Sequence, residues 1–378
     1  METLRALIRG DLSPAGNPII IEPSSIEDGL FDNGYHTEWV DSGTSALALA
    51  LLNCKKQFEH IEKPQVIIPG YCCPDLVAAA VYAGVEPLLV DTGVDDASYD
   101  LQELKSAVNP QVIAIVAINF LGIKANLTEI RSAISDQKIK LIEDNAQWFP
   151  DNKQQQFSSD YIIFSFGRGK PLSLLGGGAL LSKDPLEFSI EPREIRSGLS
   201  YQLKLRAYNL LLHPHAYCFL NRAPFLKLGE TRLYSHEDIQ PMSLTARALL
   251  LRNRDSYLQR TGEVISLYQE WCADRNYQLP AGMGTERQGR LLRFPLLLKN
   301  QSDRDKLYGL LTKNGLGASL LYQYQLNKID QVASKVSLHS NLTNAQSFAQ
   351  RLITLPVHDF VSRTHVQKIK RIFIDAFQ

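Results

Sequence analysis

The sequence predicts a doubly wound α/β domain followed by a smaller α+β domain, and three observations support this fold class. Between Asp41 and Ser182, short apolar runs rich in Val and Ile alternate with segments whose apolar residues recur at three- and four-residue spacing. The apolar runs contain few polar residues, so helices should cover both faces of their sheet. After about Ser235 longer helical stretches replace this alternation. We therefore expect a large domain over 1–235 and a small domain over 236–378.

Six candidate strands follow one another in the large domain. They are QVIIP from Gln65, EPLLV from Glu86, QVIAIVAI from Gln111, IKLIE from Ile139, YIIFSF from Tyr161 and GALLS from Gly178. Helical spacing marks SALALALLNCKKQF from Ser45, DLVAAAVYAG from Asp75, DLQELKSAV from Asp100 and NLTEIRSAI from Asn126. Such sheets bind ligands outside the carboxyl ends of their strands, so we expect function in the loops that leave those ends.

The rest of the chain is less regular. An apolar segment from Ala207 to Thr231, within an insertion at about 200–230, is interrupted by His, Arg and Pro. It fits a buried interface element or a substrate-facing lid. In the small domain we expect a strand in LLRFPLLLK from Leu291, a helix near Asp303 and a strand in LITLP. The closing basic amphipathic segment VQKIKRIFIDAF is expected to pack on the core.

Composition excludes several classes of function. Forty basic residues balance forty acidic ones in the 378-residue chain, so composition gives no support for a nucleic-acid partner or a strong membrane-steering field. The five cysteines lack C-x-x-C spacing, which argues against a disulfide framework and a structural zinc site. No apolar run reaches the roughly 18 residues of a membrane span, and the N-terminus lacks a signal-peptide pattern. We expect a cytoplasmic protein with small-molecule ligands and no metal.

Lys170 stands in an unusual stretch, DYIIFSFGRGKPLSLLGGGALL from Asp160. A phosphate-binding loop would need a glycine where Phe164 stands and Ser or Thr where Pro171 stands, so that motif fails. A lysine that forms a Schiff base needs a strand end, glycines that allow close approach, and a partly desolvated amine. The alternative is an exposed turn lysine, and the neighbouring loops decide between the two.

Three further loops favour the Schiff-base interpretation. Asp144 follows the apolar run IKLI, where a buried carboxylate needs a cation such as a pyridinium nitrogen. DSGTSALALALL from Asp41 places hydroxyls at a helix N-terminus, where a phosphate would bind, although ordinary capping explains that motif as well. Ser165 offers another hydroxyl five residues before the lysine. Phosphate, pyridinium and aldehyde are the three groups by which pyridoxal 5′-phosphate is held.

Four stretches together resemble a known family. SGTSALALAL, VIIPGYCCPDLVAAAVYAGVEPLLVD, LIEDNAQ and SFGRGKPLSLLGGGALL are similar, in order and spacing, to the DegT/DnrJ/StrS sugar aminotransferases, pyridoxal-phosphate enzymes of fold type I. The resemblance continues through LLRFPLLL and AQRLITLPVH to the small domain. It implies transfer of an amino group from glutamate or glutamine to a keto group of a nucleotide-linked sugar or a related cyclic ketone. It also implies a homodimer.

The resemblance assigns roles to particular residues. Lys170 would bind the cofactor aldehyde and move the proton, Asp144 would hold the pyridinium, and Gln147 would lie near the phenolic oxygen. Thr44, Ser45 and Ser165 fall on phosphate-binding positions. Gln147 could instead cap a helix N-terminus.

Two positions depart from the family pattern. Cys73 stands where an aromatic residue usually stacks on the pyridine ring, with Tyr71 two residues earlier as the other candidate. Pro241 stands where a polar residue usually reaches the phosphate across the dimer, and Arg168 is the candidate to replace its charge, although it could also be a surface arginine. The rival functions are a dehydratase of the same fold, which would carry His in place of Lys170, and a non-catalytic relative.

Overall fold

A computed structural model describes residues 10–25, 30–134, 138–191, 193–221, 231–275, 277–283 and 290–377. Its centre is an eight-stranded sheet with the order β1-β7-β6-β5-β4-β2-β3-β9. Strands β2 to β6 and β9 pair with one another in parallel. Strand β7 is antiparallel to both of its neighbours, β6 and β1. The strands are β1 (His36–Val40), β2 (Gln65–Pro69), β3 (Glu86–Val90), β4 (Val112–Ile118), β5 (Lys140–Asp144), β6 (Tyr161–Ser165), β7 (Gly178–Ser182) and β9 (Ser337–Leu338).

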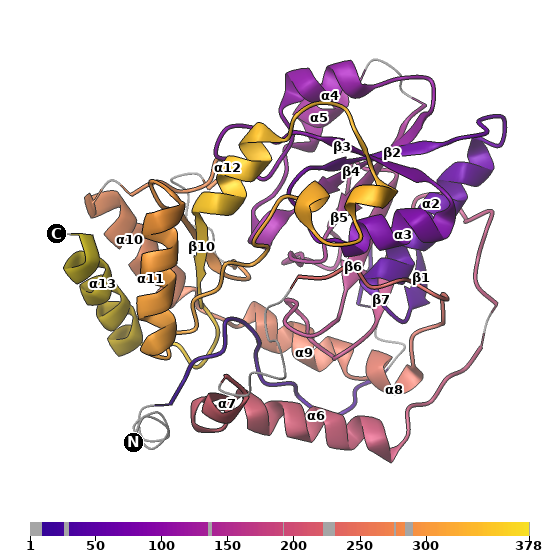
Figure 1. Cartoon of the computed structure of the whole chain (residues 1–378). Coiled ribbons are helices and arrows are strands. Elements are labelled where there is room, and N and C mark those ends of the chain that lie inside the picture. Colours follow the sequence, from indigo (N-terminus) through magenta and orange to yellow (C-terminus); the bar gives the residue numbers. More distant parts are fainter. Residues whose placement is uncertain are drawn as a thin grey trace.

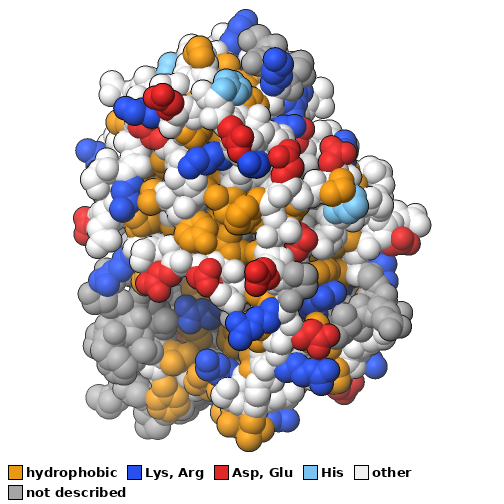
Figure 2. All heavy atoms as spheres, turned by 90° about the vertical axis from the view of Figure 1, so that its right-hand side faces the viewer, with side chains coloured by type: hydrophobic (Ala, Val, Ile, Leu, Met, Phe, Trp, Pro, Cys, Tyr) orange, Lys and Arg blue, Asp and Glu red, His pale blue; other side chains and the backbone are white. Residues whose placement is uncertain are grey.

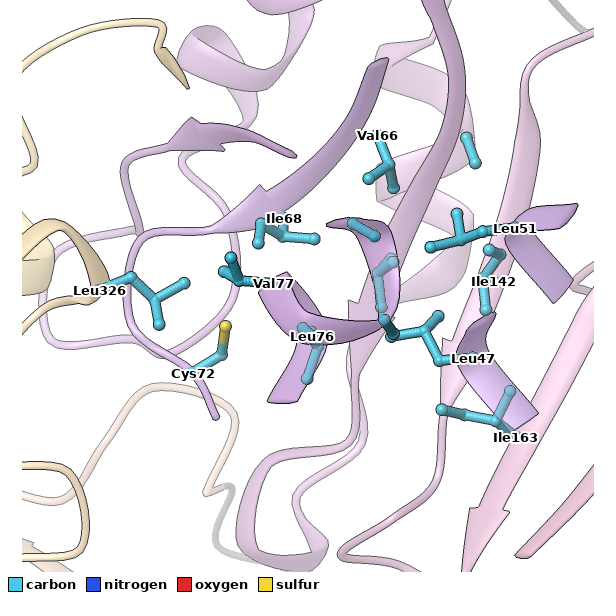
Figure 3. Close-up of a cluster of buried hydrophobic side chains, with 14 of the residues drawn as sticks. Leu47, Leu51, Val66, Ile68, Cys72, Leu76, Val77, Ile142, Ile163 and Leu326 are labelled. Atoms are coloured by element: carbon cyan, nitrogen blue, oxygen red, sulfur yellow. The ribbon is translucent and has the colours of Figure 1, made fainter. Parts of the chain in front are cut away.

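Helices cover both faces of this sheet (Figure 1). Apolar residues of α2 (Gly43–Gln57) and α3 (Asp75–Ala83) pack against one face, and those of α4 (Leu101–Ala107) and α5 (Leu127–Ala133) against the other. Figure 3 shows Leu47 and Leu51 of α2 beside Ile142 and Ile163 of the sheet. The two-sided burial explains why these strands are apolar along their whole length.

A third cluster of buried side chains joins β6 and β7 to segments distant in sequence. Ile19 of the N-terminal segment, Leu205 of α6 (Leu199–Leu212) and Tyr257 of α9 (Leu250–Leu258) contribute to it. Two short helices, α7 (Pro214–Asn221) and α8 (Leu244–Arg247), complete this side of the molecule. The described part of the 207–231 segment is therefore helical, and one of its faces packs on the large domain.

The C-terminal part has its own hydrophobic core, which α10 (Glu263–Arg275), α11 (Gln301–Lys313) and α13 (Arg363–Phe377) build on the antiparallel pair β8 (Phe294–Leu297) and β10 (Leu352–Leu355). Two features join this core to the large sheet. Strand β9 pairs with β3, and the buried Asp91 just after β3 accepts the N–H groups of Asn344 and Ala345 in the first turn of α12 (Thr343–Arg351), both at 2.9 Å.

The structure confirms the predicted fold class and all six predicted strands of the large domain, with ends shifted by at most one residue. The sequence analysis missed β1 and β9. The proposed division between residues 235 and 236 stays a prediction. Helices α8 and α9, which follow it in the chain, pack with the large domain. Within the described residues no helix is both long and apolar enough to span a bilayer.

Candidate active site

A pocket lies at the carboxyl ends of the parallel strands, as predicted for this class of sheet. Its walls come from the ends of β4, β5 and β6, the loop after β2, and the first turns of α2 and α3. Six of the eight residues that the sequence analysis selected line it: Thr44, Cys73, Asp144, Gln147, Ser165 and Lys170. These residues lie up to 126 positions apart in the chain, and only the sheet topology brings them together.

Lys170 reaches the pocket from a tight turn after β6. The N–H of Lys170 donates to the carbonyl of Gly167 at 3.3 Å, and Gly169 has φ +74°, which glycine adopts readily. Lys170 is half-buried rather than exposed. Its charge lowers the pKa values of Asp144 and Cys73, against the larger opposing effect of burial. The exposed-turn alternative for this lysine therefore does not hold.

Asp144 is the last residue of β5, and its side chain is buried. Burial raises the pKa of this carboxyl, while the N–H of Ala146, 2.8 Å from Oδ1, and the charge of Lys170 oppose the rise. A buried carboxylate with one hydrogen bond is poorly compensated and attracts a cation. Asp144 is therefore well placed to hold a protonated ring nitrogen.

The first turn of α2 forms the polar end of the pocket. Ser42 caps the helix, since its Oγ accepts the N–H of Ser45 at 3.0 Å. The N–H groups of Gly43 and Thr44 have no partner within the helix, and they carry the positive end of the helix dipole. Gly43 packs directly on Ser165, because an added Cβ would lie 2.6 Å from the Ser165 Cβ. This arrangement suits a phosphate group.

Ser45 and Arg168, which were also expected to bind the phosphate, do not line this pocket. Ser45 is fully buried, and its hydroxyl donates to Oδ1 of Asp41 at 2.5 Å, so it belongs to the capping network of α2. Arg168 is exposed on the turn before Lys170. Pro241 forms an isolated antiparallel β-bridge with Val40 of β1, at the edge of the sheet.

The structure distinguishes the two candidates for stacking on the cofactor ring. Tyr71 lies fully buried in the core, where its ring contacts Phe120 and Phe348 and its hydroxyl donates to the Tyr322 carbonyl at 2.9 Å. Cys73 instead lines the pocket. Burial raises the pKa of the Cys73 thiol to about 12, so it is a neutral, soft contact surface and not a thiolate.

Gln147 lines the pocket and bonds to two segments distant in the chain. Its Oε1 accepts the N–H of Leu121 at 2.9 Å, and its Nε2 donates to the Tyr322 hydroxyl at 3.3 Å. Leu121 and Leu321, the residue before Tyr322, both have positive φ, 54° and 57°. Non-glycine residues in this region are strained, and such strain collects at functional sites. Tyr322 is a site residue that the sequence analysis missed.

Behind the pocket, a buried polar network fixes the loops after β4 and β5. Asn119 donates to Oε1 of Glu143 at 3.0 Å, and Ser159 donates to Oε2 of the same carboxylate at 2.9 Å. Asn119 also accepts the N–H of Ala125 at 2.8 Å. Because Glu143 directly precedes Asp144, this network holds the carboxyl end of β5 in place.

Arg293, just before β8, was not singled out from the sequence; it does not line the pocket but lies near Tyr322, the partner of Gln147. Its Nε is buried without a hydrogen-bond partner, and among the described residues no acidic side chain pairs with it. Burial lowers the pKa of Arg293. The nearby hydroxyl groups of Tyr322, Tyr217 and Tyr71 oppose this shift. A buried guanidinium without an acid offers a place for an anion.

The comparisons with known proteins agree with this geometry. The sequence profile of the DegT/DnrJ/EryC1/StrS aminotransferase family matches residues 34–197 and 245–373. The UDP-2-acetamido-2-deoxy-3-oxo-D-glucuronate aminotransferase of Pseudomonas aeruginosa is 24% identical over 316 residues, 81% of this chain and 77% of that protein. Protein MosB of Rhizobium meliloti is 31% identical over 181 residues, which span 47% of this chain and only 34% of MosB.

Solved structures share the fold. The putative sugar aminotransferase Spr1654 from Streptococcus pneumoniae, in its PLP form, has a TM-score of 0.69 at 18% identity, covering 100% of this chain and 96% of that one. The GDP-4-keto-6-deoxy-D-mannose-3-dehydratase of Escherichia coli has a TM-score of 0.64 at 18% identity, covering 89% and 87%.

The residues of the pocket fit pyridoxal phosphate, the cofactor of this family. A helix N-terminus and two hydroxyls form one end, an under-compensated carboxyl lies in the wall, and a half-buried lysine enters from a glycine-rich turn. The family resemblance inferred from the sequence is thereby confirmed by the profile match, which covers most of the chain. The chain belongs to the DegT/DnrJ/EryC1/StrS aminotransferase family, and its cofactor is pyridoxal phosphate.

Proposed function

We propose that this enzyme transfers an amino group from glutamate or glutamine to a keto group of a nucleotide-linked sugar or a similar cyclic ketone. The donor leaves as its 2-oxo acid and the acceptor gains the amine, so atoms balance without a further reactant. The observation that carries the proposal is the meeting of Lys170 and Asp144 in one pocket beside the first turn of α2. The named relatives that act on UDP- and dTDP-linked sugars support the acceptor class.

Bound pyridoxal phosphate supplies an aldehyde that carries the amino group and a ring that takes up electrons from the substrate carbon. The chain's own residues prepare that chemistry. Thr44 and Ser165, with the N-terminal N–H groups of α2, bind and orient the phosphate. Asp144 keeps the ring nitrogen protonated, and Cys73 contacts the ring face.

Lys170 has two tasks in this proposal. Its Nζ would hold bound cofactor through the aldehyde, and the same amine, when free, would serve as the base that moves the proton of the donor's α-carbon. Gln147 and Tyr322, hydrogen-bonded to each other, close the pocket on the small-domain side.

We infer that Arg293 binds a carboxylate of the amino donor. Its buried Nε has no partner, and its planar fork suits a carboxylate in a bidentate contact. Such a contact contributes about 1.5 to 3 kcal/mol, so Arg293→Ala should raise KM for glutamate on the order of tenfold or more. If KM for glutamate is unchanged in Arg293→Ala, the carboxylate is bound elsewhere.

The rival activity is the dehydratase of the same fold, which one structural neighbour represents. Lys170, which that class replaces by His, is present here and faces the pocket beside Asp144. The same two residues argue against a non-catalytic relative, since neither would need to be kept.

One experiment separates these functions. The purified enzyme with glutamate is incubated with a panel of nucleotide-linked keto-sugars and cyclic ketones, and products are read by mass spectrometry. Gain of an amino group with formation of 2-oxoglutarate supports the proposal. Loss of water from the sugar with no amine gained identifies a dehydratase, and no product from any keto-sugar or cyclic ketone contradicts the acceptor class.

We also propose a cytoplasmic homodimer. None of the five cysteines, all of which the structure describes, forms a disulfide, and two of them are adjacent, which fits a reducing compartment. The pocket borders α2 and α3, and Figure 2 shows hydrophobic side chains among charged ones across the face on which these helices lie. A second copy of the chain on this face would cover both that surface and the pocket.

A further inference from the structure

Helices α6 and α7 lie in a part of the chain that the family profile does not match. The profile stops at residue 197 and resumes at residue 245, so the intervening stretch lies outside the matched family pattern. Residues 199–221 of that stretch form two consecutive helices, α6 and α7. Its purpose is not explained by the cofactor pocket, whose lining residues all lie outside it.

The inner face of α6 is anchored to the large domain. Leu205 and Leu212 are buried, and Tyr201 donates its hydroxyl to the Leu174 carbonyl at 2.9 Å. Asn209 forms two hydrogen bonds with the backbone of Ile19, each 2.8 Å long. The helix is thus held in one orientation, with its other face turned to the outside along the lower edge of the molecule in Figure 1.

That outer face is apolar. Leu199, Leu203 and Leu210 are 72%, 56% and 68% exposed. At about 100° per residue, these three side chains lie within a sector of about 40° of the helix circumference. The solvent-facing side of a surface helix normally carries polar residues. An exposed stripe of leucines therefore indicates a surface that binds a partner or a membrane.

The charge around the stripe is of one sign. Lys204 and Arg206 are exposed on α6, and no Asp or Glu occurs from Ile195 to Asn221. This local pattern coexists with a net charge of zero for the whole chain. Leucines flanked by basic residues are typical of helices that lie in the interface of an anionic membrane, because long basic side chains reach the headgroups while the leucines enter the acyl boundary.

We propose that the outer face of α6 docks the enzyme on an anionic lipid surface. A second copy of this chain is a poorer cover for the same face. A two-fold contact through a stripe this narrow would bring the Lys204 and Arg206 side chains of both copies together without a compensating acid on α6. An anionic bilayer instead attracts both residues.

The test is co-sedimentation of the purified full-length holoenzyme with vesicles of phosphatidylcholine, either alone or mixed with phosphatidylglycerol. We expect binding to the mixed vesicles that weakens as salt is added, and little binding to phosphatidylcholine alone. Leu203→Glu/Leu210→Glu should lower the partition coefficient on the order of a hundredfold, and Lys204→Ser/Arg206→Ser on the order of tenfold or more.

Val94→Glu/Leu338→Glu is the matched control, because it adds the same two charges at exposed apolar positions away from α6. Retained cofactor absorbance shows that each variant is folded. Equal binding by the α6 variants and the control, or no binding of the wild type to mixed vesicles, overturns the proposal. A drop in molar mass on light scattering that is specific to Leu203→Glu/Leu210→Glu would assign the face to a second copy instead.

Discussion

Lys170 has a position that no other property of the turn explains, since Gly167 and Gly169 alone would join β6 to the segment that follows. We expect the purified protein to show a visible absorbance band from cofactor held by this lysine, and borohydride to abolish the band by fixing the cofactor on it. Lys170→Ala should lose both the band and all transfer activity, because no other amine lies in the described pocket wall.

Lys183→Ala is the control, since Lys183 is exposed just after β7. Peptide mapping after reduction identifies the modified residue. Cofactor found on a lysine other than Lys170 would show that the assignment is wrong.

Asp144 couples cofactor binding to stability. Burial raises its pKa in the folded apo-protein, so the unfolded chain releases this proton more readily than the folded one. Stability from this group is therefore greatest at acidic pH and falls as pH rises from the unfolded pKa through the raised folded pKa. We expect apo Asp144→Asn to melt at a higher temperature than apo wild type at neutral pH, with the gap closing on acidification.

The same substitution should weaken cofactor binding, because a neutral amide does not compensate a pyridinium charge. Thermal melts across pH, with and without cofactor, measure both effects. An apo Asp144→Asn protein that is less stable than wild type at neutral pH, or one that binds the cofactor normally, would contradict this account of Asp144.

The site residues divide by how local their sequence signals are. Lys170, Asp144 and Thr44 could be selected because each lies at or shortly after the end of a strand or at the start of a helix, and the edge of a parallel sheet brings such positions together. Tyr322 and Arg293 follow Lys170 by more than 120 residues, and Tyr322 packs against the core of the large sheet, a long-range contact that no short pattern encodes. The role of Ser45 stays a prediction; its hydroxyl bonds to Asp41 in the capping network of α2, a tertiary detail that its sequence position does not reveal.

At the scale of elements, the contact between α2 and β6 shapes the phosphate end of the pocket. An added Cβ at Gly43 would lie 2.6 Å from the Cβ and 2.9 Å from the Oγ of Ser165. Gly43→Ala should therefore displace the first turn of α2 and weaken cofactor affinity on the order of tenfold or more, the loss of a charge-assisted contact. Equilibrium titration of the apo-protein with pyridoxal phosphate measures this.

Gly309→Ala in α11 provides the comparison, because a Cβ there meets no neighbouring atom. It should leave affinity unchanged and stabilise the helix by about 0.5 to 1 kcal/mol. Unchanged affinity in Gly43→Ala as well would mean that the helix end tolerates the shift.

The elements themselves were predicted unequally well. The buried parallel strands could be predicted because each is an almost continuous run of Val, Ile and Leu. Strand β1, HTEWV, mixes polar and apolar residues because it lies at the sheet edge and is only partly buried. Strand β9 has two residues and exists only through its pairing with β3, so no propensity reveals it.

For the whole molecule we predict a dimer that covers the face formed by α2 and α3. Val81 on α3 is 43% exposed on this face. The first turn of the same helix lines the pocket. Val81→Glu should shift the mass measured by light scattering from dimer towards monomer and lower cofactor occupancy in parallel. Val94→Glu, at an exposed position outside α3 in the loop after β3, should do neither. A fully active wild-type monomer would rule out a shared active site.

The pairing of β9 with β3 also matters while the protein is being made. Val90 ends β3, and the segment that pairs with it, together with the N–H groups that Asp91 accepts, follows only about 250 residues later. At ordinary rates of translation the ribosome needs on the order of ten to fifty seconds to add that length. During that interval the outer edge of β3 presents unpaired backbone N–H and C=O groups, the feature that invites pairing with other chains. The last quarter of the chain thus pairs this edge. A large domain released without it would keep the outer edge of β3 unpaired.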